Sequence, residues 1–340
     1  MSSSVAMRTG RALIDASRPY AVEIPSRSWQ ALLLTILFLT ATTAASVVLP
    51  QPLARGIVAT FSGLLIVRMF ILFHDAMHGA IFRRSPVARA VLSAFAVLTL
   101  TPPRVWRDTH NYHHAHTAKI VGSHIGSFPM TTKSLWAKMS TPQRVGYVLT
   151  RHPLTIAAAY FTVFMWGMCL GPFLRNPRRN VQALATFVLN VVLSLFLITR
   201  FVFATFAFAY GYPLALATAF GAYLFYAQHN FPDARIQPRE DWTYTRAALE
   251  SSSYMEMGPV LRYFTGSIGF HHVHHLNSMI PFYRLEEAMR AIPKLQTPGR
   301  TSLRPADIRA CLRLGIWSPE DGKMVPLAVH LAGESSTVTE

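Results

Sequence analysis

The sequence predicts an all-α, multi-pass membrane protein with four spanning helices, interfacial segments and a cytoplasmic cap rich in histidine. Of the 340 residues, 51% are apolar and 14% are charged, whereas an ordinary soluble domain carries roughly 25% charged residues. The apolar residues gather in long stretches, and basic residues stand between these stretches. Together these observations argue against a water-soluble globular protein.

The charge is strongly unbalanced, with 32 Lys and Arg against 16 Asp and Glu, a formal net charge of +16. In a soluble protein such an excess would indicate a nucleic-acid partner. Here the basic residues flank apolar stretches, where they fit the positive-inside pattern and contacts with lipid headgroups. We therefore expect the basic residues to contact a membrane surface, and we expect no nucleic-acid partner.

Residues 1–29 are polar and are expected to form a cytoplasmic N-terminal segment. The long charge-free stretch after Arg27 predicts a first span at about 30–49, since a crossing needs roughly 20 apolar residues. A cleaved signal peptide is the alternative, but its polar leader would be long and a second apolar stretch follows at once. That stretch predicts a span at 56–73, with Arg68 near enough to its end to snorkel to the surface.

The middle of the chain holds four further apolar segments of unequal length. Val91–Pro103 is too short for a crossing and is expected to be interfacial or re-entrant. The polar, basic stretch 104–153 follows it, with the aromatic and cationic mixture of a headgroup surface. Three longer apolar segments then occupy Leu154–Leu174, about 181–199 and about 203–226.

Histidine clusters constrain which of these segments cross. If His114 and His229 face one site, an even number of crossings must separate them. Three arginines within 175–179 place the loop after Leu154–Leu174 in the cytoplasm by the positive-inside rule. Leu154–Leu174 is therefore expected not to cross, although its hydropathy alone predicts a span. Both termini and every histidine cluster then lie on the cytoplasmic side of the cell (inner) membrane.

The chain divides into three parts by composition. Residues 1–29 form the N-terminal segment, 30–293 form a membrane-embedded domain with the histidine motifs, and 294–340 form a polar C-terminal tail. The acidic, Ser/Thr-rich end of this tail is expected to be disordered. The two cysteines, Cys169 and Cys311, stand far apart, so neither a disulfide framework nor a cysteine metal site is predicted.

Histidine is the strongest indication of function, because eleven of the 14 histidines fall in four places. His74 and His78 have i,i+4 spacing, which puts both rings on one helical face. The motif HxxHH occurs twice, and each copy again presents its histidines on one face. Such repeated spacing indicates metal ligation. The candidate ligands are His74, His78, His110, His113, His114, His271, His274 and His275, with His229 as a ninth.

The number of ligands indicates two metal ions, because eight or nine imidazoles exceed what one ion coordinates. Imidazole suits Zn, Cu, Fe and Ni, so the spacing leaves the metal open. A metal transporter is one interpretation, but transporters place polar ligands near the middle of the membrane. Here the clusters lie at the ends of spans and in loops, which favours a catalytic site at the membrane surface.

Four motifs carry a resemblance to a known family. The chain resembles the membrane-bound fatty acid desaturase superfamily, and most of all its bacterial and cyanobacterial acyl-lipid desaturases of the delta-12 or omega-6 type. The resemblance runs from about Ile71 to Pro293. The motifs are HDAMHG at 74–79, HNYHHAHT at 110–117, FYAQHNF at 225–231 and FTGSIGFHHVHHLNSMIPFYRLEEA at 264–288.

The resemblance implies a diiron centre that uses O2 and two electrons to introduce a cis double bond into an acyl chain. It implies a membrane lipid or acyl thioester as substrate, and the nine histidines named above as iron ligands and catalytic residues. No HPGG, GxGxxG or cysteine cluster occurs, so we expect ferredoxin or a similar external protein as electron donor. A sister hydroxylase or ketolase acting on fatty acid, alkane or carotenoid has the same motifs and stays an alternative.

Several residues near the motifs are expected to have supporting roles or to depart from the family pattern. Ala76 and Met77 stand where many relatives have a small pair such as Cys-Gly. His116 and His272 are outside the ligand spacing and are expected to be second-shell or surface residues. Three polar residues are candidates for orienting the imidazoles through their second nitrogens. They are Asp75, Asp108 and Asn277.

Overall fold

The computed structural model describes residues 3–120 and 125–327. Four helices in this part of the chain are long and apolar enough to cross a membrane, which confirms the predicted all-α fold and its four spans. They are α2 (Pro25–Val48), α3 (Pro52–His78), α10 (Val181–Arg200) and the continuous helix of α11 (Phe203–Phe206), η3 (Ala207–Gly211) and α12 (Tyr212–His229).

The second span is longer than predicted, and its extra turns carry the first histidine motif. Helix α3 begins at Pro52, whose fixed φ suits a first helical turn. It ends at Gly79, which has φ 76° in the left-handed region that glycine adopts without strain. The helix therefore holds His74 and His78 rigidly at the end of a span.

Arg68 of α3 does not snorkel to the surface, so that expectation was wrong. Its side chain is buried, donates hydrogen bonds to the Tyr263 carbonyl and the Thr35 hydroxyl, and lies 3.8 Å from the Tyr263 ring centroid. These neutral and aromatic partners satisfy the guanidinium inside the protein. Arg68 thereby ties α3 to α2 and to the short helix α14 (Pro259–Phe264).

The segment predicted to be interfacial or re-entrant is a bent helix pair. Helices α4 (Pro86–Leu98) and α5 (Pro103–His116) meet at 94°, the geometry of a broken span or a re-entrant loop. Buried polar groups satisfy the turn, since Asn190 donates to the Val97 carbonyl at 2.8 Å. Irregular backbone at membrane depth is tolerated where protein groups satisfy it in this way. The bend lets α5 rise toward the histidine-rich cap.

Leu154–Leu174 is not one continuous helix. It is divided into α8 (Pro153–Ala157), the π-helical segment η2 (Tyr160–Leu170) and α9 (Gly171–Arg175), and these are not among the four spanning candidates. By length and composition these segments add no spanning candidate among the described residues, and the absence of a crossing here stays a prediction.

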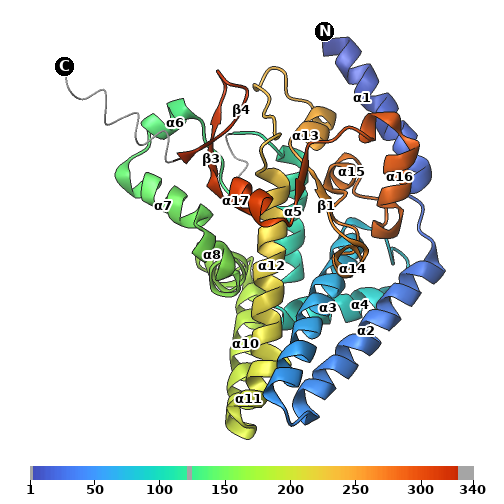
Figure 1. The fold of residues 1–340 in the computed structure, drawn as a ribbon, viewed down its shortest axis with the longest axis vertical. Coiled ribbons are helices and arrows are strands. Elements are labelled where there is room, and N and C mark those ends of the chain that lie inside the picture. Colours follow the sequence, from blue (N-terminus) through green and yellow to red (C-terminus); the bar gives the residue numbers. More distant parts are fainter. Residues whose placement is uncertain (1–2, 121–124, 328–340) are drawn as a thin grey trace.

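Short elements form a cap above one end of the spans (Figure 1). Figure 1 places α1 (Ser3–Ser17) along one side of this cap and α7 (Thr141–Arg151) on the other. The remaining helices are α6 (Lys133–Ala137), α13 (Tyr244–Glu250), α15 (His271–Leu276), α16 (Leu285–Ala291) and α17 (Pro305–Arg313), with 3-10 turns η1 (Arg18–Tyr20), η4 (Phe282–Arg284) and η5 (Pro293–Leu295).

The polar C-terminal segment folds onto the cap through two small sheets that the sequence pattern did not predict. Strand β1 (Tyr254–Glu256) pairs in parallel with β2 (Arg300–Ser302). Strand β3 (Leu314–Ser318) pairs antiparallel with β4 (Lys323–Pro326). The acidic end expected to be disordered lies in 328–340, outside the described residues.

A buried arginine fastens this C-terminal segment to the spans. Arg151 donates to the Pro129 carbonyl at 2.7 Å, to Asn230 Oδ1 at 2.6 Å and to the Leu314 carbonyl at 3.1 Å. Asn230 follows the last residue of α12 directly. The network thus joins α7, the end of α12 and β3 next to His229.

Candidate metal centre

All nine histidines singled out from the sequence come together in the cap. Helix α3 supplies two, α5 supplies three, the last residue of α12 supplies His229, and α15 supplies three. Eight of the nine are buried, and His78 is partly buried. Four segments that are distant in sequence therefore build one polar cluster in the core of the cap.

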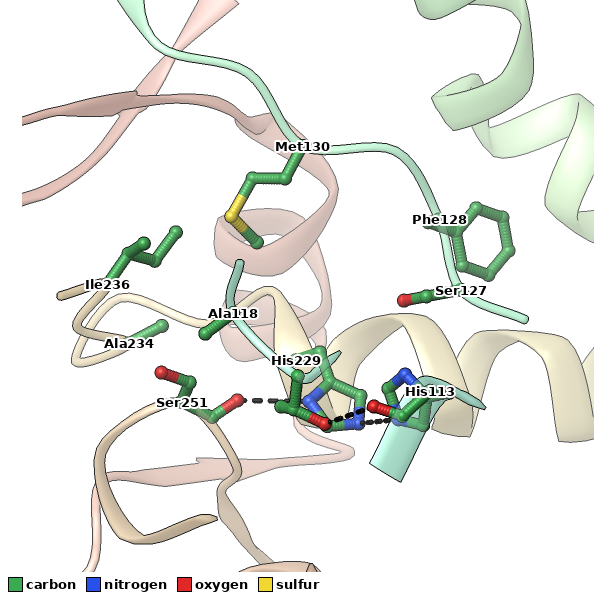
Figure 2. Close-up of a pocket in the computed structure, with 10 residues that line it drawn as sticks. His113, Ala118, Ser127, Phe128, Met130, His229, Ala234, Ile236 and Ser251 are labelled. Atoms are coloured by element: carbon green, nitrogen blue, oxygen red, sulfur yellow. Dashed lines mark hydrogen bonds between the residues drawn. The ribbon is translucent and has the colours of Figure 1, made fainter. Parts of the chain in front are cut away.

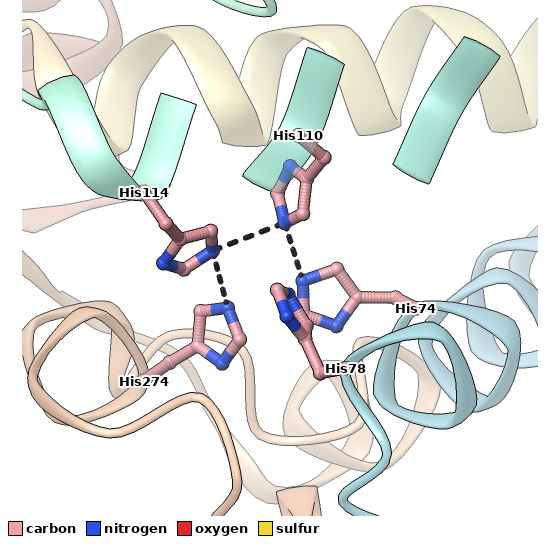
Figure 3. A group of neighbouring side chains, drawn as sticks. All are labelled: His74, His78, His110, His114 and His274. Carbon is pink, nitrogen blue, oxygen red and sulfur yellow. Dashed lines mark hydrogen bonds between the residues drawn. The ribbon is translucent and has the colours of Figure 1, made fainter. Parts of the chain in front are cut away.

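The cluster consists of two groups. In each, one ring nitrogen per residue lies within 4.8 Å of those of the other members. The four-histidine group contains the pair His113 and His229, whose Nε2 atoms are 3.0 Å apart (Figure 2). Its members are His113, His229, His271 and His275. The five-histidine group surrounds a common centre in Figure 3. Its members are His74, His78, His110, His114 and His274.

Each HxxHH motif divides its histidines between the two groups. On α5, His110 and His114 join the five-histidine group while His113 joins the other. On α15 the division is reversed, since His274 alone joins the five-histidine group. The rings of His114 and His275 stack at 4.2 Å between centroids, so the two groups lie side by side.

Burial keeps six candidate ligand imidazoles on α5 and α15 neutral. Their pKa values fall well below the ordinary 6.5, first because burial disfavours the imidazolium form and second because neighbouring imidazoles would repel its charge. Metal binding requires this neutral form. The residues are His110, His113, His114, His271, His274 and His275.

Three hydrogen bonds fix which ring nitrogen faces the interior of each group. The Nδ1–H of His229 donates to the Ser251 carbonyl at 3.0 Å. Thr117 Oγ1 lies 3.3 Å from Nδ1 of His275 and donates to the His113 carbonyl at 2.8 Å, so its lone pair is free to accept from His275. Anchoring at Nδ1 leaves Nε2 unprotonated and available as a ligand.

The third hydrogen bond belongs to the five-histidine group. His74 Nδ1 donates to Asp75 Oδ1 at 3.0 Å, and Asp75 Oδ2 accepts from the Phe282 backbone N–H at 2.7 Å. Asp75 therefore orients an imidazole, as the sequence indicated. Asp108 does not, because it pairs with Arg179 at 3.2 Å on the surface.

The other candidates for supporting residues also lie away from the groups. Asn277 donates to Ser17 Oγ at 2.9 Å. His116 stacks on Tyr112 at 3.9 Å, and His272 lies 3.0 Å from the Leu295 carbonyl. Sequence reasoning missed Thr117 and Ser251 as orienting residues. Thr117 stands four residues after His113, so helical spacing is the one feature that pointed to it.

The donor set fits metal ions. Nε2 atoms of adjacent imidazoles face one another at 2.9–3.1 Å in six pairs, among them His229 with His271, His114 with His274, and His74 with His110. His78 Nε2 is buried with no hydrogen-bond partner. Converging lone pairs and an unpaired buried nitrogen are costly in a bare protein, and a cation at the centre of each group satisfies them.

An aromatic wall lies on the side of the five-histidine group that faces the spans. The Trp106 ring stacks on His110 at 4.3 Å between centroids and meets Phe73 at 5.1 Å and Phe70 at 5.9 Å. Trp106 and Phe73 are buried. The wall gives this face of the centre a dry, apolar boundary.

A small pocket touches the other group. Its lining includes His113 and His229, with Ser251 near His229 (Figure 2). Thr117 and Ser127 also line it. The remaining lining residues are apolar, namely Ala118, Phe128, Met130, Ala234 and Ile236.

Comparison with known proteins identifies the family. The model of the family "Fatty acid desaturase" matches residues 46–304, more than half of the chain. The chain belongs to the fatty acid desaturase family. This desaturase is 28% identical over 268 residues to a "Fatty acid desaturase" of Bacillus subtilis (strain 168), covering 76% of this chain and 74% of the relative.

Two plant proteins are more distant relatives of this desaturase. The "Delta(12)-fatty-acid desaturase FAD2" of Vernicia fordii is 23% identical, covering 72% of this chain and 68% of that protein. The "sn-2 acyl-lipid omega-3 desaturase (ferredoxin), chloroplastic" of Arabidopsis thaliana is 23% identical, covering 77% of this chain and 56% of that protein. The predicted family is thus confirmed, and with it an oxidoreductase acting on a lipid or acyl substrate.

Proposed function

We propose that this desaturase introduces a cis double bond into a lipid-linked acyl chain, using two iron ions, O2 and two electrons. The observation that carries the proposal is the pair of buried, all-histidine groups lying side by side at the end of the spans. No comparison supports the alternatives, a sister hydroxylase or ketolase or a metal transporter.

The metal assignment follows from the two groups. His74, His78, His110, His114 and His274 would hold one ion, and His113, His229, His271 and His275 the other. Bound iron supplies the oxidising chemistry: a CH2–CH2 unit, O2, two electrons and two protons yield CH=CH and two water molecules. Neutral imidazoles leave the ions more cationic than carboxylates would, which suits attack on an unactivated C–H bond.

The chain's own residues position the ligands and exclude water. Asp75, Thr117 and the Ser251 carbonyl hold three imidazoles in the ligating tautomer. Trp106 and Phe73 give the acyl chain a dry approach from the membrane side. Exclusion of water protects a strongly oxidising centre from side reactions.

A fatty acid analysis tests the function. Expression in a host that lacks polyunsaturated lipids is expected to yield a new unsaturated fatty acid, whose double bond mass spectrometry locates. His113→Ala should abolish this product, whereas His116→Ala, on the same helix but outside both groups, should retain it. A hydroxylated or keto product would favour the sister oxidase, and metal flux without O2 consumption would favour a transporter.

The active site is proposed to lie on the cytoplasmic side of the cell (inner) membrane. The support is the positive-inside rule applied to the exposed loop that contains Arg175, Arg178 and Arg179. Cys169 and Cys311 are buried, so they give little background in a labelling experiment. With both replaced, Asn176→Cys should resist an impermeant external thiol reagent in intact cells and react after lysis. Labelling from outside would overturn this topology.

The electron donor is proposed to be a separate ferredoxin or similar protein. The support is the absence of a redox-module motif in the sequence and the net charge of +16, which would attract an acidic partner. Transfer from reduced ferredoxin should slow as salt is added. A rate independent of ionic strength would count against this electrostatic docking.

A further inference from the structure

The pocket shown in Figure 2 touches the four-histidine group and not the five-histidine group. Both histidines in its lining, His113 and His229, belong to the four-histidine group. Its volume is about 20 Å³, which is room for roughly one water-sized molecule. The pocket therefore suits a very small ligand and excludes an acyl chain.

The walls of the pocket favour an apolar occupant. Figure 2 shows the Met130 side chain pointing into it, above Ala118 and beside Ile236. The polar groups at the base are already engaged, since Ser251 O accepts from His229 and Thr117 Oγ1 contacts His113 O and His275. A charged or strongly hydrogen-bonding ligand would lose its hydration with little return.

The pocket also has a solvent-facing neighbour. A groove of about 490 Å³ shares Ile236 with the pocket, and its lining also includes Arg235, Gln237 and Asp321. Ile236 is thus the common wall between an open groove on the cap and the pocket beside the histidines. A small molecule that passes Ile236 would move from the groove on the cap surface to the four-histidine group.

The number of histidines in each group also favours binding of a small external ligand at the four-histidine group. A metal held by four imidazoles has one more position free for an external ligand than a metal held by five. Non-haem iron sites that react with O2 keep such open positions. The aromatic wall of Trp106 lies instead against His110 of the five-histidine group.

We propose that this pocket is the route by which O2 reaches the four-histidine group from the cap, separately from the acyl chain. The inference rests on the proposed iron centre. Met130 and Ile236 are its specificity-determining residues, because their apolar side chains set the width of the passage and keep ions out. The acyl chain approaches from the opposite, membrane-facing side.

Nitric oxide binding tests the route without turnover. The probe is nitric oxide added to the detergent-solubilised, fully ferrous protein without donor or substrate, and the readout is the association rate of the iron–nitrosyl absorbance in stopped flow. Met130→Trp is expected to slow association at least about tenfold, and Ile236→Ala to leave it unchanged or faster. The control is Met139→Trp, because Met139 is also partly buried but packs in another cluster. It should bind nitric oxide like the wild type.

The outcomes separate this inference from the function on which it rests. Equal rates in Met130→Trp and Met139→Trp, with equal iron content, would overturn the route and leave the iron centre standing. A wild type that binds no iron would overturn both. If Met130→Trp fails to fold, Met130→Phe replaces it with the same expectation, and iron content and circular dichroism establish that each variant is intact.

Discussion

Thr117 Oγ1 lies 3.3 Å from Nδ1 of His275 while its proton is directed to the His113 carbonyl, 2.8 Å away. One hydroxyl therefore links two histidine motifs and holds His275 in the ligating tautomer. Thr117→Val keeps the shape but removes the acceptor, so metal affinity should fall roughly 10- to 100-fold. Metal content after dialysis against graded chelator measures this. Thr117→Ser should retain the metal; if it loses as much metal as Thr117→Val, the hydroxyl is not the cause.

Asp75 should strengthen metal binding by the five-histidine group, because its carboxylate accepts hydrogen bonds from His74 Nδ1 and from the Phe282 backbone N–H. In Asp75→Asn a neutral amide replaces the carboxylate, and metal affinity is expected to fall about 10- to 100-fold. The same chelator titration reports it. Asp108→Asn is the matched control, since Asp108 pairs with Arg179 away from the histidines, and it should behave like the wild type.

Arg151 should contribute strongly to stability. It donates to four acceptors, among them Asn230 beside His229. Arg151→Met removes the donor to Asn230 Oδ1 and to the Pro129 carbonyl, and the free energy of unfolding should fall by on the order of 3 kcal/mol. A lower thermal midpoint in detergent would show this. The exposed Arg309 is the comparison, and a decrease of equal size in Arg309→Met would argue against a specific role for the network.

Stability should also fall at alkaline pH. Tyr147 donates to the Gly315 carbonyl, and burial raises the pKa of its phenol above the ordinary 10.0. The unfolded chain loses this proton at a lower pH than the folded chain, so folding weakens as pH rises above 10. Tyr147→Phe should lower stability by about 1 kcal/mol at neutral pH and reduce the loss above pH 10. Thermal midpoints of both proteins at several pH values test this, and parallel curves would contradict it.

The sequence alone determined which histidines gather in the candidate metal centre. Spacings of i,i+3 and i,i+4 place side chains on one face of a single helix, so the motifs on α3, α5 and α15 could be recognised from the sequence. The four spans could be predicted because the thickness of a bilayer sets the length of the apolar segments that cross it. The requirement that His114 and His229 face one side also predicts that Leu154–Leu174 does not cross.

Only the tertiary structure decided how the ligands are shared. Neighbours such as His274 and His275 point about 100° apart on one helix, and the group that each one joins depends on the segments packed around α15. Arg68 is buried because it contacts Tyr263, and since Tyr263 comes from a distant part of the chain, only the tertiary structure shows this contact. Contacts such as Thr117 with His275 and Ser251 with His229 likewise join distant segments. Local sequence carries the identity of each ligand, whereas its partner and orientation depend on packing between segments.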